Sequence, residues 1–235
     1  MMRQLVLNFP FKRSYTIEDF FISDANALAF AWLKRWPLWA SPETEGGGFI
    51  AYGPSGCGKT HLIHAFCQMT PTYLIPPQLR EGAEAGDSVD AHISAGATYR
   101  SWALDDVDEW LGSRARERNL FAIVCHCHAH NKTLLLTSRQ PVRACVLLAD
   151  LQSRLAAMPA AAITPPDDAL LAAVISKLFH DRQRHVDDEV IAFMIARMER
   201  RFDVAIRLVA ELEQHAAEKQ QKITIPLVKT LLVPS

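Results

Sequence analysis

The sequence has no surplus of charge of either sign. Its 25 Lys and Arg residues nearly balance its 26 Asp and Glu residues, which leaves a formal net charge of −1. A strongly one-signed chain generates a field that attracts nucleic acid or anionic membranes. The balance excludes such a global field, so any contact of this kind must be local.

Cysteines and long apolar runs are also scarce. Five cysteines, scattered from Cys57 to Cys145, do not form the dense disulfide framework of a small secreted protein, and we expect reduced thiols. No stretch approaches the roughly 20 apolar residues of a membrane span, and the first residues, "MMRQLVLNFPFKRSYT", lack the apolar core of a signal peptide. We therefore expect a cytoplasmic protein that does not bind membranes.

Short apolar runs bounded by turn residues recur along the first two thirds of the chain. Helical patterns lie between most of them, which predicts an α/β fold with a parallel five-stranded sheet covered by helices on both faces. The stretch 80–96, rich in Gly, Ala, Asp and Ser, breaks this rhythm and reads as a loop or a degraded helix. The runs are 49–52, 72–75, 101–104, 133–137 and 160–163.

After Pro165 the strand patterns stop and only helical periodicity remains. Asp167 or Asp168 can cap one helix, a second starts near Asp187, and a third starts near Asp203. The chain is therefore predicted to contain an N-terminal arm (1–14), an α/β domain (15–165) and an all-helical domain (166–235).

The motif "GPSGCGKT" follows the first predicted strand and precedes a helix, which is the setting of a phosphate-binding loop. Its glycines allow backbone N–H groups to turn toward phosphates, Lys59 neutralises the terminal phosphates, and Thr60 offers a hydroxyl to Mg²⁺. The residues assigned to nucleotide binding here are Gly53, Pro54, Ser55, Gly56, Cys57, Gly58, Lys59, Thr60 and His61.

In "WALDDVDEW" an apolar strand ends in two carboxylates. Asp105 would lie at the carboxyl edge of the sheet, where it could hold Mg²⁺ together with Thr60, and Asp106 could orient an attacking water. The alternative is that both acids simply end a strand.

Three further polar residues are candidates for phosphate contacts. Ser138 ends another strand in "TLLLTSRQPV" and could sense the γ-phosphate, although strand-terminal Ser is also a common turn residue. Arg154 and Arg207 can each fork onto phosphate oxygens, whereas a lone arginine is more often a surface ion-pair partner.

Two clusters have simpler explanations. His126 and His130 in "CHCHAHN" are spaced four residues apart, but no second ligand cluster has zinc-site spacing, so an ordinary helix is favoured over a metal site. Trp32, Trp36 and Trp39 are expected to pack a helix against the sheet.

Taken in order, "GPSGCGKT", "ALDD", "LLLTSR", "DLQSRL" and the helical ending resemble the AAA+ ATPase module of the DnaA-related family, from about Tyr15 to Leu232. The resemblance is closer to the Hda regulators of that family, because the chain ends after "KITIPLVKTLL" without a helix-turn-helix domain. It implies no direct sequence-specific DNA binding, and it makes the 166–235 domain a lid.

The resemblance also implies roles for individual residues. Asp105 would belong to the metal and Asp106 to the water, Arg207 would be the sensor in the lid, and Arg154 would be an arginine finger that acts on a neighbouring subunit's nucleotide. The adenine would lie against Phe20, Phe21 and Ile22. Arg139 departs from the family's acidic residue at this position, which puts sensing from Ser138 and the chain's own hydrolysis in doubt.

The N-terminal "QLVLNF" looks like the peptides that bind the replicative sliding clamp. Leu5, Leu7 and Phe9 could enter an apolar pocket while Gln4 makes an orienting hydrogen bond. The same residues alternate, so a first β-strand is the alternative.

These patterns favour a regulator that binds ATP or ADP with Mg²⁺ and, with the sliding clamp, promotes hydrolysis of DnaA-bound ATP to inhibit replication initiation. Its own ATPase would be weak at most, and a homodimer is left open. The alternatives are a self-sufficient ATPase such as a helicase loader and, third, a small-molecule kinase.

Overall fold

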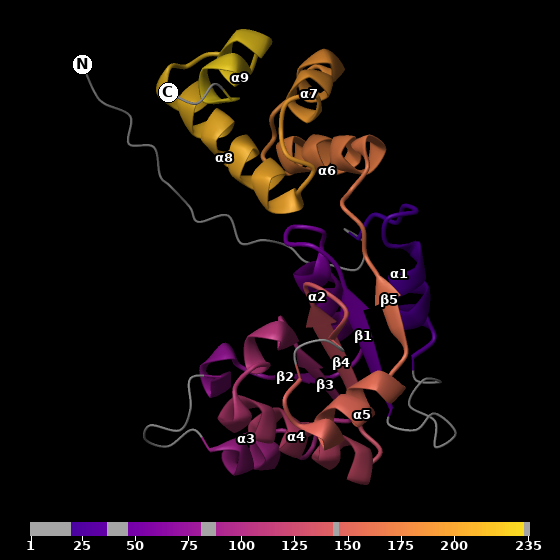
Figure 1. Ribbon diagram of the computed structural model, residues 1–235. Helices are drawn as coiled ribbons and strands as arrows, with labels where there is room; N and C mark the ends of the chain where they lie inside the picture. The colour runs from indigo at the N-terminus through magenta and orange to yellow at the C-terminus, as the bar shows by residue number, and fades with distance from the viewer. Residues whose placement is uncertain (1–19, 37–46, 81–87, 143–145, 233–235) are drawn as a thin grey trace, which may run out of the picture. The chain divides into compact units, whose positions relative to one another are not determined.

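The computed structural model describes residues 20–36, 47–80, 88–142 and 146–232. These residues fall into two compact units, with the division between Thr164 and Pro165. Each unit has hydrophobic cores of its own. Figure 1 shows the helices and strands of both units.

The first unit is built on a sheet of five parallel strands in the order β2-β3-β4-β1-β5. This confirms the predicted parallel five-stranded sheet. Parallel strands need crossover connections, and helices supply them between these strands. The strands are β1 (Gly48–Tyr52), β2 (Thr72–Leu74), β3 (Ser101–Leu104), β4 (Thr133–Ser138) and β5 (Ala160–Ala162).

The helices of this unit connect the strands and cover the sheet. One of them, α3, occupies the end of the irregular stretch 80–96, where the Ser88 hydroxyl caps it by accepting the N–H of Ala91 at 3.2 Å. The helices are α1 (Ala27–Lys34), α2 (Lys59–Met69), α3 (Val89–Ala95), α4 (Arg114–Ala129) and α5 (Ala149–Ala157), with short 3₁₀ turns η2 (Pro77–Arg80) and η3 (Val107–Trp110).

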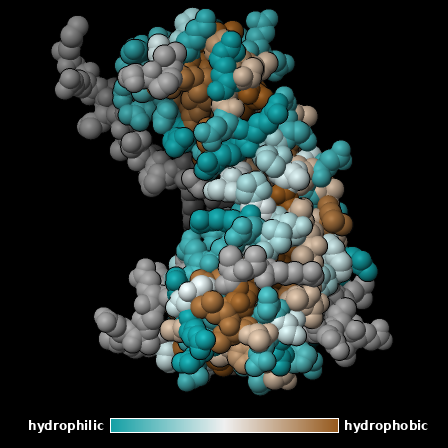
Figure 2. Space-filling view, in the orientation of Figure 1, coloured by the Kyte–Doolittle hydropathy of each residue, from teal (hydrophilic) through white to brown (hydrophobic). Residues whose placement is uncertain are grey.

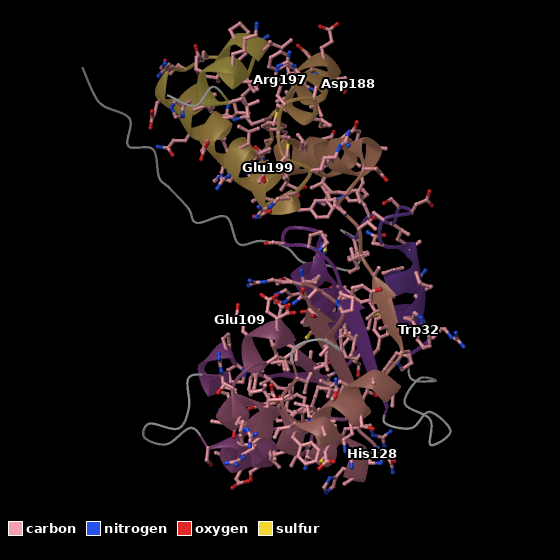
Figure 3. The ribbon with its side chains drawn as sticks, viewed as in Figure 1. Trp32, Glu109, His128, Asp188, Arg197 and Glu199 are labelled. Carbon is pink, nitrogen blue, oxygen red and sulfur yellow. The ribbon has the colours of Figure 1, made fainter. Side chains whose placement is uncertain are left out.

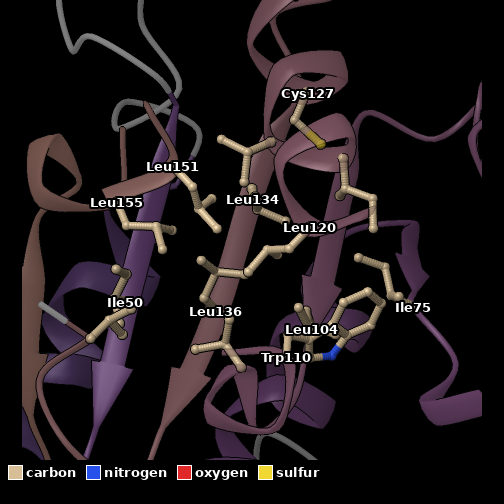
Figure 4. Close-up of a cluster of buried hydrophobic side chains, with 14 of the residues drawn as sticks. Ile50, Ile75, Leu104, Trp110, Leu120, Cys127, Leu134, Leu136, Leu151 and Leu155 are labelled. Carbon is tan, nitrogen blue, oxygen red and sulfur yellow. The ribbon is translucent and has the colours of Figure 1, made fainter. Parts of the chain in front are cut away.

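Alternate residues of β4 enter two different cores, because successive side chains of a strand point to opposite faces. Leu134 and Leu136 pack with residues of α4 and α5, including Leu120 and Leu151 (Figure 4). Leu135 instead joins the core formed with α1 and α2. The sheet is therefore covered on both faces, as the continuous apolar strand patterns predict.

Two of the predicted tryptophans pack α1 and the turn after it against this sheet. Trp32 stacks on Phe49 of β1 with ring centroids 5.5 Å apart, and the indole N–H of Trp36 donates to the Thr133 hydroxyl at 3.3 Å. This confirms the packing role of both residues; Trp39 lies outside the described residues.

The second unit consists of helices α6 (Asp168–Asp181), α7 (Asp188–Ile195), α8 (Phe202–Glu218) and α9 (Ile225–Leu232). Asp167 caps α6, since its carboxylate accepts the N–H of Leu170 at 2.7 Å. Apolar faces such as those holding Ile175, Leu212 and Val228 form the core, and hydrophilic side chains predominate outside it in Figure 2. Within the described parts of the chain, no helix combines the length and apolar character that crossing a membrane requires.

Candidate functional site

The predicted phosphate loop connects β1 to α2, and its glycines have backbone conformations that other residues rarely adopt. Gly56 and Gly58 have φ angles of 77° and 103°. A Cβ on Gly53 would lie 2.0 Å from the carbonyl oxygen of Ile163, so only glycine fits there. The sequence therefore produces a tight loop with exposed residues at its tip, Pro54 and Ser55.

Lys59, the first residue of α2, lies beneath this loop and is only 6% exposed. Its ammonium donates to the carbonyl oxygens of Gly53 at 2.8 Å and Pro54 at 3.0 Å. Burial raises the pKa of the neighbouring Cys57 thiol, and the Lys59 charge partly opposes that rise. The loop thus carries a fixed cation next to the N-terminus of a helix, which is an arrangement that favours phosphate.

Asp105 follows β3 and meets residues from two other elements. It accepts a hydrogen bond from the hydroxyl of Thr60 on α2 at 2.7 Å and another from the hydroxyl of Thr137 on β4. The Thr137 oxygen also accepts the backbone N–H of Asp106 at 2.9 Å. Hydroxyl and carboxylate oxygens are the ligands that Mg²⁺ prefers, so Thr60 and Asp105 fit this ion.

Asp106 itself lies in the left-handed region, with φ 52° and ψ 58°. Its carboxylate is 3.7 Å from the guanidinium of Arg139, which also donates to Glu109 at 2.9 Å. Glu109 is labelled in Figure 3. The predicted water-orienting residue is therefore part of an ion-pair cluster.

Ser138, the predicted phosphate sensor, is buried. Its hydroxyl donates to Asp108 at 2.7 Å and also contacts the carbonyl oxygen of Gln140, while Asp108 accepts the N–H of Arg139 at 2.6 Å. Sensing by Ser138 stays a prediction.

The segment predicted to cushion adenine runs beside the first turn of α2. Phe20 is buried, stacks on Phe30 at 5.0 Å and meets the ring of His61 edge-on at 5.2 Å. Phe21 is half-buried and Ile22 is 53% exposed. Adenine contacts by these residues stay a prediction.

Arg154 lies in the last turn of α5 and is half-buried. Its guanidinium carbon is 5.8 Å from the centre of the Phe121 ring on α4. No ion pair joins Arg154 to another of the residues that the structure describes. The side chain therefore rests on an aromatic ring, and no side-chain hydrogen bond joins it to another residue in the described ranges.

A residue that the sequence reasoning missed holds the start of the same helix. The carboxylate of Glu117 on α4 is fully buried, and it accepts the N–H groups of Gly112 at 2.9 Å, Leu147 at 2.8 Å and Leu148 at 2.8 Å. Leu148 is the N-cap residue of α5. Because Leu147 and Leu148 are 30 and 31 residues from Glu117, no local motif predicts these two contacts.

Of the remaining predicted site residues, the structure describes only Arg207. Arg207 is exposed on α8 of the second unit, and its role as a sensor stays a prediction. Gln4, Leu5, Leu7 and Phe9 lie outside the described residues.

The histidine cluster belongs to the end of α4 (His128 is labelled in Figure 3). The rings of His126 and His130 are 4.3 Å apart, and burial lowers the pKa of His126, with smaller contributions from His130 and Lys132. Among the residues that could be searched, no group of three or more His, Cys, Asp or Glu is arranged to hold a metal ion. The cluster thus belongs to the last turn of α4 and to its C-cap residue, His130.

The C-terminal helices match a known protein family. Residues 168–232 match the family model described as Hda, lid domain. The whole chain is 27% identical to an uncharacterised protein of Haemophilus influenzae, over 99% of both chains.

Solved structures share the fold. Domain III of DnaA from Thermotoga maritima has a TM-score of 0.77 and 19% identity, covering 96% of this chain and 100% of that one. AMPPCP-bound DnaA from Aquifex aeolicus has a TM-score of 0.68 and 20% identity, covering 87% and 65%. The RuvB Holliday junction branch migration motor of Thermotoga maritima has a TM-score of 0.66 and 15% identity, covering 93% and 71%. The C-terminal helices thus match the Hda lid-domain model, and the chain shares the fold of domain III of DnaA.

Proposed function

We propose that the chain binds an adenine nucleotide, ATP or ADP, with Mg²⁺ at the phosphate loop. The support is the fixed Lys59, the glycine backbone beside it, and the 2.7 Å contact between Thr60 and Asp105. The related DnaA of Aquifex aeolicus was solved with AMPPCP bound. Mg²⁺, when bound, would neutralise charge on the phosphate oxygens.

In this proposal each residue has a separate task. The backbone N–H groups of residues 55–58 and the Lys59 ammonium bind phosphate oxygens, while Thr60 and Asp105 hold the metal. Thr137 positions the Asp105 carboxylate by hydrogen bonding. Replacing Lys59 with Ala is expected to abolish nucleotide binding in a fluorescence titration, and unchanged affinity would refute the site.

We further propose that the protein is a regulator of replication initiation that acts on ATP held by DnaA. The observation that carries this proposal is the state of Arg154, whose guanidinium rests on Phe121 without an ion pair to a described residue. A guanidinium supplied in trans stabilises charge that develops during phosphoryl transfer and is worth about 10³–10⁵ in rate. Arg154 would complete the hydrolytic site of a DnaA subunit in this way.

Docking on the sliding clamp through Gln4, Leu5, Leu7 and Phe9 would bring Arg154 to DnaA at the replication site. The support for this step is the sequence pattern "QLVLNF", in which apolar anchors alternate as peptide-binding pockets require. The proposal as a whole is tested by measuring hydrolysis of ATP preloaded on DnaA, with clamp and DNA present. The chain should accelerate the reaction, and a Gln4→Ala, Leu5→Ala double variant should not; no acceleration by the wild type would refute the proposal.

A second candidate is a self-sufficient ATPase such as a helicase loader. It is favoured by the presence of Lys59, Thr60, Asp105 and Asp106 within one unit, with Thr60 and Asp105 in contact. It predicts ATP turnover by the protein alone, abolished by Asp106→Asn. Absence of turnover without partners would remove this candidate.

A further inference from the structure

The turn after β3 and the end of β4 form a compact charged cluster beside the Thr60–Asp105 contact. Four acidic residues follow β3, namely Asp105, Asp106, Asp108 and Glu109, and Arg139 follows β4. β3 and β4 are neighbouring parallel strands, so their carboxyl ends meet at the same edge of the sheet. The cluster therefore lies where the proposed nucleotide site is.

Both partners of the Asp106–Arg139 pair are anchored through their backbones. The N–H of Asp106 donates to the Thr137 hydroxyl at 2.9 Å, and the N–H of Arg139 donates to Asp108 at 2.6 Å. The second oxygen of Asp108 accepts the Ser138 hydroxyl at 2.7 Å. The backbone positions of Asp106 and Arg139 are thus fixed next to each other at the ends of β3 and β4.

The guanidinium lies between two carboxylates. One terminal nitrogen of Arg139 is 2.9 Å from Glu109 and 3.7 Å from Asp106. The Asp106 side chain is 33% exposed, so water can reach it, whereas Glu109 keeps the cation beside it. Two anions around one cation make the arrangement a small network, which is more persistent than an isolated surface pair.

We propose that Arg139 is a brake on the chain's own ATP hydrolysis, because it holds the Asp106 carboxylate in an ion pair. This inference rests on the proposed nucleotide site. In hydrolysis the oxygen of a water bonds to the terminal phosphorus, the bond to the bridging oxygen breaks and leaves ADP, and the water's proton passes to a carboxylate. A carboxylate orients that water by accepting its hydrogen bond, and a guanidinium 3.7 Å away reduces the negative charge that the carboxylate offers to the water.

The consequence is a division of labour between the two arginines. Arg139 keeps the resident nucleotide intact, so that it acts as a structural ligand of the α/β unit. Arg154 is left to act on the nucleotide of another subunit. A regulator built this way keeps its bound ATP, whereas a motor protein would hydrolyse its ATP in every cycle.

The test compares ATP turnover by the purified full-length chain, without DnaA or clamp, for wild type and Arg139→Gln. The variant should raise kcat about tenfold, a fraction of what a positioned base contributes, and it should leave the dissociation constant for ATP unchanged. Arg139→Lys retains the cation and should stay near the wild-type rate. Adding Asp106→Asn to Arg139→Gln should return turnover to the wild-type level.

Arg200→Gln is the matched control, since it removes a similarly exposed pair, with Asp168, in the second unit. It should change neither turnover nor affinity. A readout independent of activity is the NMR signal of the terminal guanidinium N–H groups of Arg139 in nucleotide-free protein, which Asp106→Asn should shift and Asp168→Asn should not.

The outcomes separate the brake from the proposed function. Intact ATP binding with unchanged turnover in Arg139→Gln would overturn the brake alone. Increased turnover that persists in the double variant would overturn the assignment to Asp106. Failure of every variant, and of the wild type, to bind ATP would overturn both the nucleotide site and the brake.

Discussion

The guanidinium of Arg154 lies 5.8 Å from the centre of the Phe121 ring, and Phe121 is one helical turn beyond Glu117 on α4. Glu117 accepts the N–H groups of Leu147 and Leu148 at the start of α5, the helix that carries Arg154. One helix therefore holds both the beginning of α5 and the arginine in its last turn. The proposed finger therefore belongs to a helix that α4 contacts at both ends.

Replacing Phe121 with Leu is expected to weaken the action of Arg154 without unfolding the protein. A cation over a ring contributes about 0.5–1 kcal/mol at exposed sites, so stimulation of DnaA-bound ATP hydrolysis should fall by up to about fivefold. Phe193→Leu is the control, because it removes a ring that lies 3.6 Å from the guanidinium of Arg197 in the second unit. Equal stimulation by both variants would contradict a positioning role for Phe121.

Glu117→Ala is expected to destabilise the first unit strongly. The change removes a buried acceptor and leaves three backbone N–H groups without their partner, which costs about 3 kcal/mol in the free energy of unfolding. Urea denaturation should show a lower midpoint than for Glu199→Ala, in which an exposed carboxylate paired with Arg201 is removed. Midpoints that agree for the two variants would show that the Glu117 contacts contribute little.

Gly53 in the phosphate loop and Gly48 in β1 should respond differently to replacement by Ala, because different atoms surround them. A Cβ on Gly53 would meet the backbone carbonyl of Ile163 at 2.0 Å, whereas a Cβ on Gly48 would meet the flexible side chain of Met158 at 2.5 Å. Gly53→Ala should therefore lower the free energy of unfolding by about 2 kcal/mol, and Gly48→Ala by less. Calorimetry of both variants tests this order, and the reverse order would contradict it.

Cys127 gives the protein a specific sensitivity to alkaline pH. Burial raises the pKa of this thiol from 9.0 to about 12, with a smaller opposing effect of Lys132. The pKa of Cys127 is higher in the folded than in the unfolded state. The contribution of this thiol to the free energy of unfolding is therefore complete below pH 9 and is lost as the pH rises toward 12. The stability difference between wild type and Cys127→Ala should therefore shrink above pH 9, as measured by urea midpoints. A constant difference would show that the thiol is not protected from ionisation, and Cys125→Ala on the same helix serves as the control.

The sequence was sufficient for the strands because each of them lies in a short apolar run that is bounded by turn residues. The helix α9 was not predicted: "IPLVKTLL" contains a proline and β-branched residues, and it is helical because Leu227 and Val228 pack into the core of the second unit. Proline is tolerated in its first turn, where its missing N–H is not required.

In the candidate site, too, contiguous motifs could be predicted from the sequence, whereas contacts between residues far apart in the sequence could not. The phosphate loop is contiguous, so its glycines and Lys59 could be assigned from spacing alone. The roles of Thr137, Asp108 and Glu117 could not, because each depends on a hydrogen bond between residues about 30 positions apart. Such contacts depend on how distant segments pack in the folded protein, and no sequence motif encodes them.

The most direct test of the central claim is the hydrolysis of ATP prebound to DnaA, measured with clamp-loaded DNA and either wild-type protein or Arg154→Ala. Arg200→Ala serves as a control for the loss of an exposed arginine. The account predicts that the wild type and the control stimulate hydrolysis while Arg154→Ala loses the stimulation by about 10³-fold or more. Equal stimulation by wild type and Arg154→Ala would contradict it.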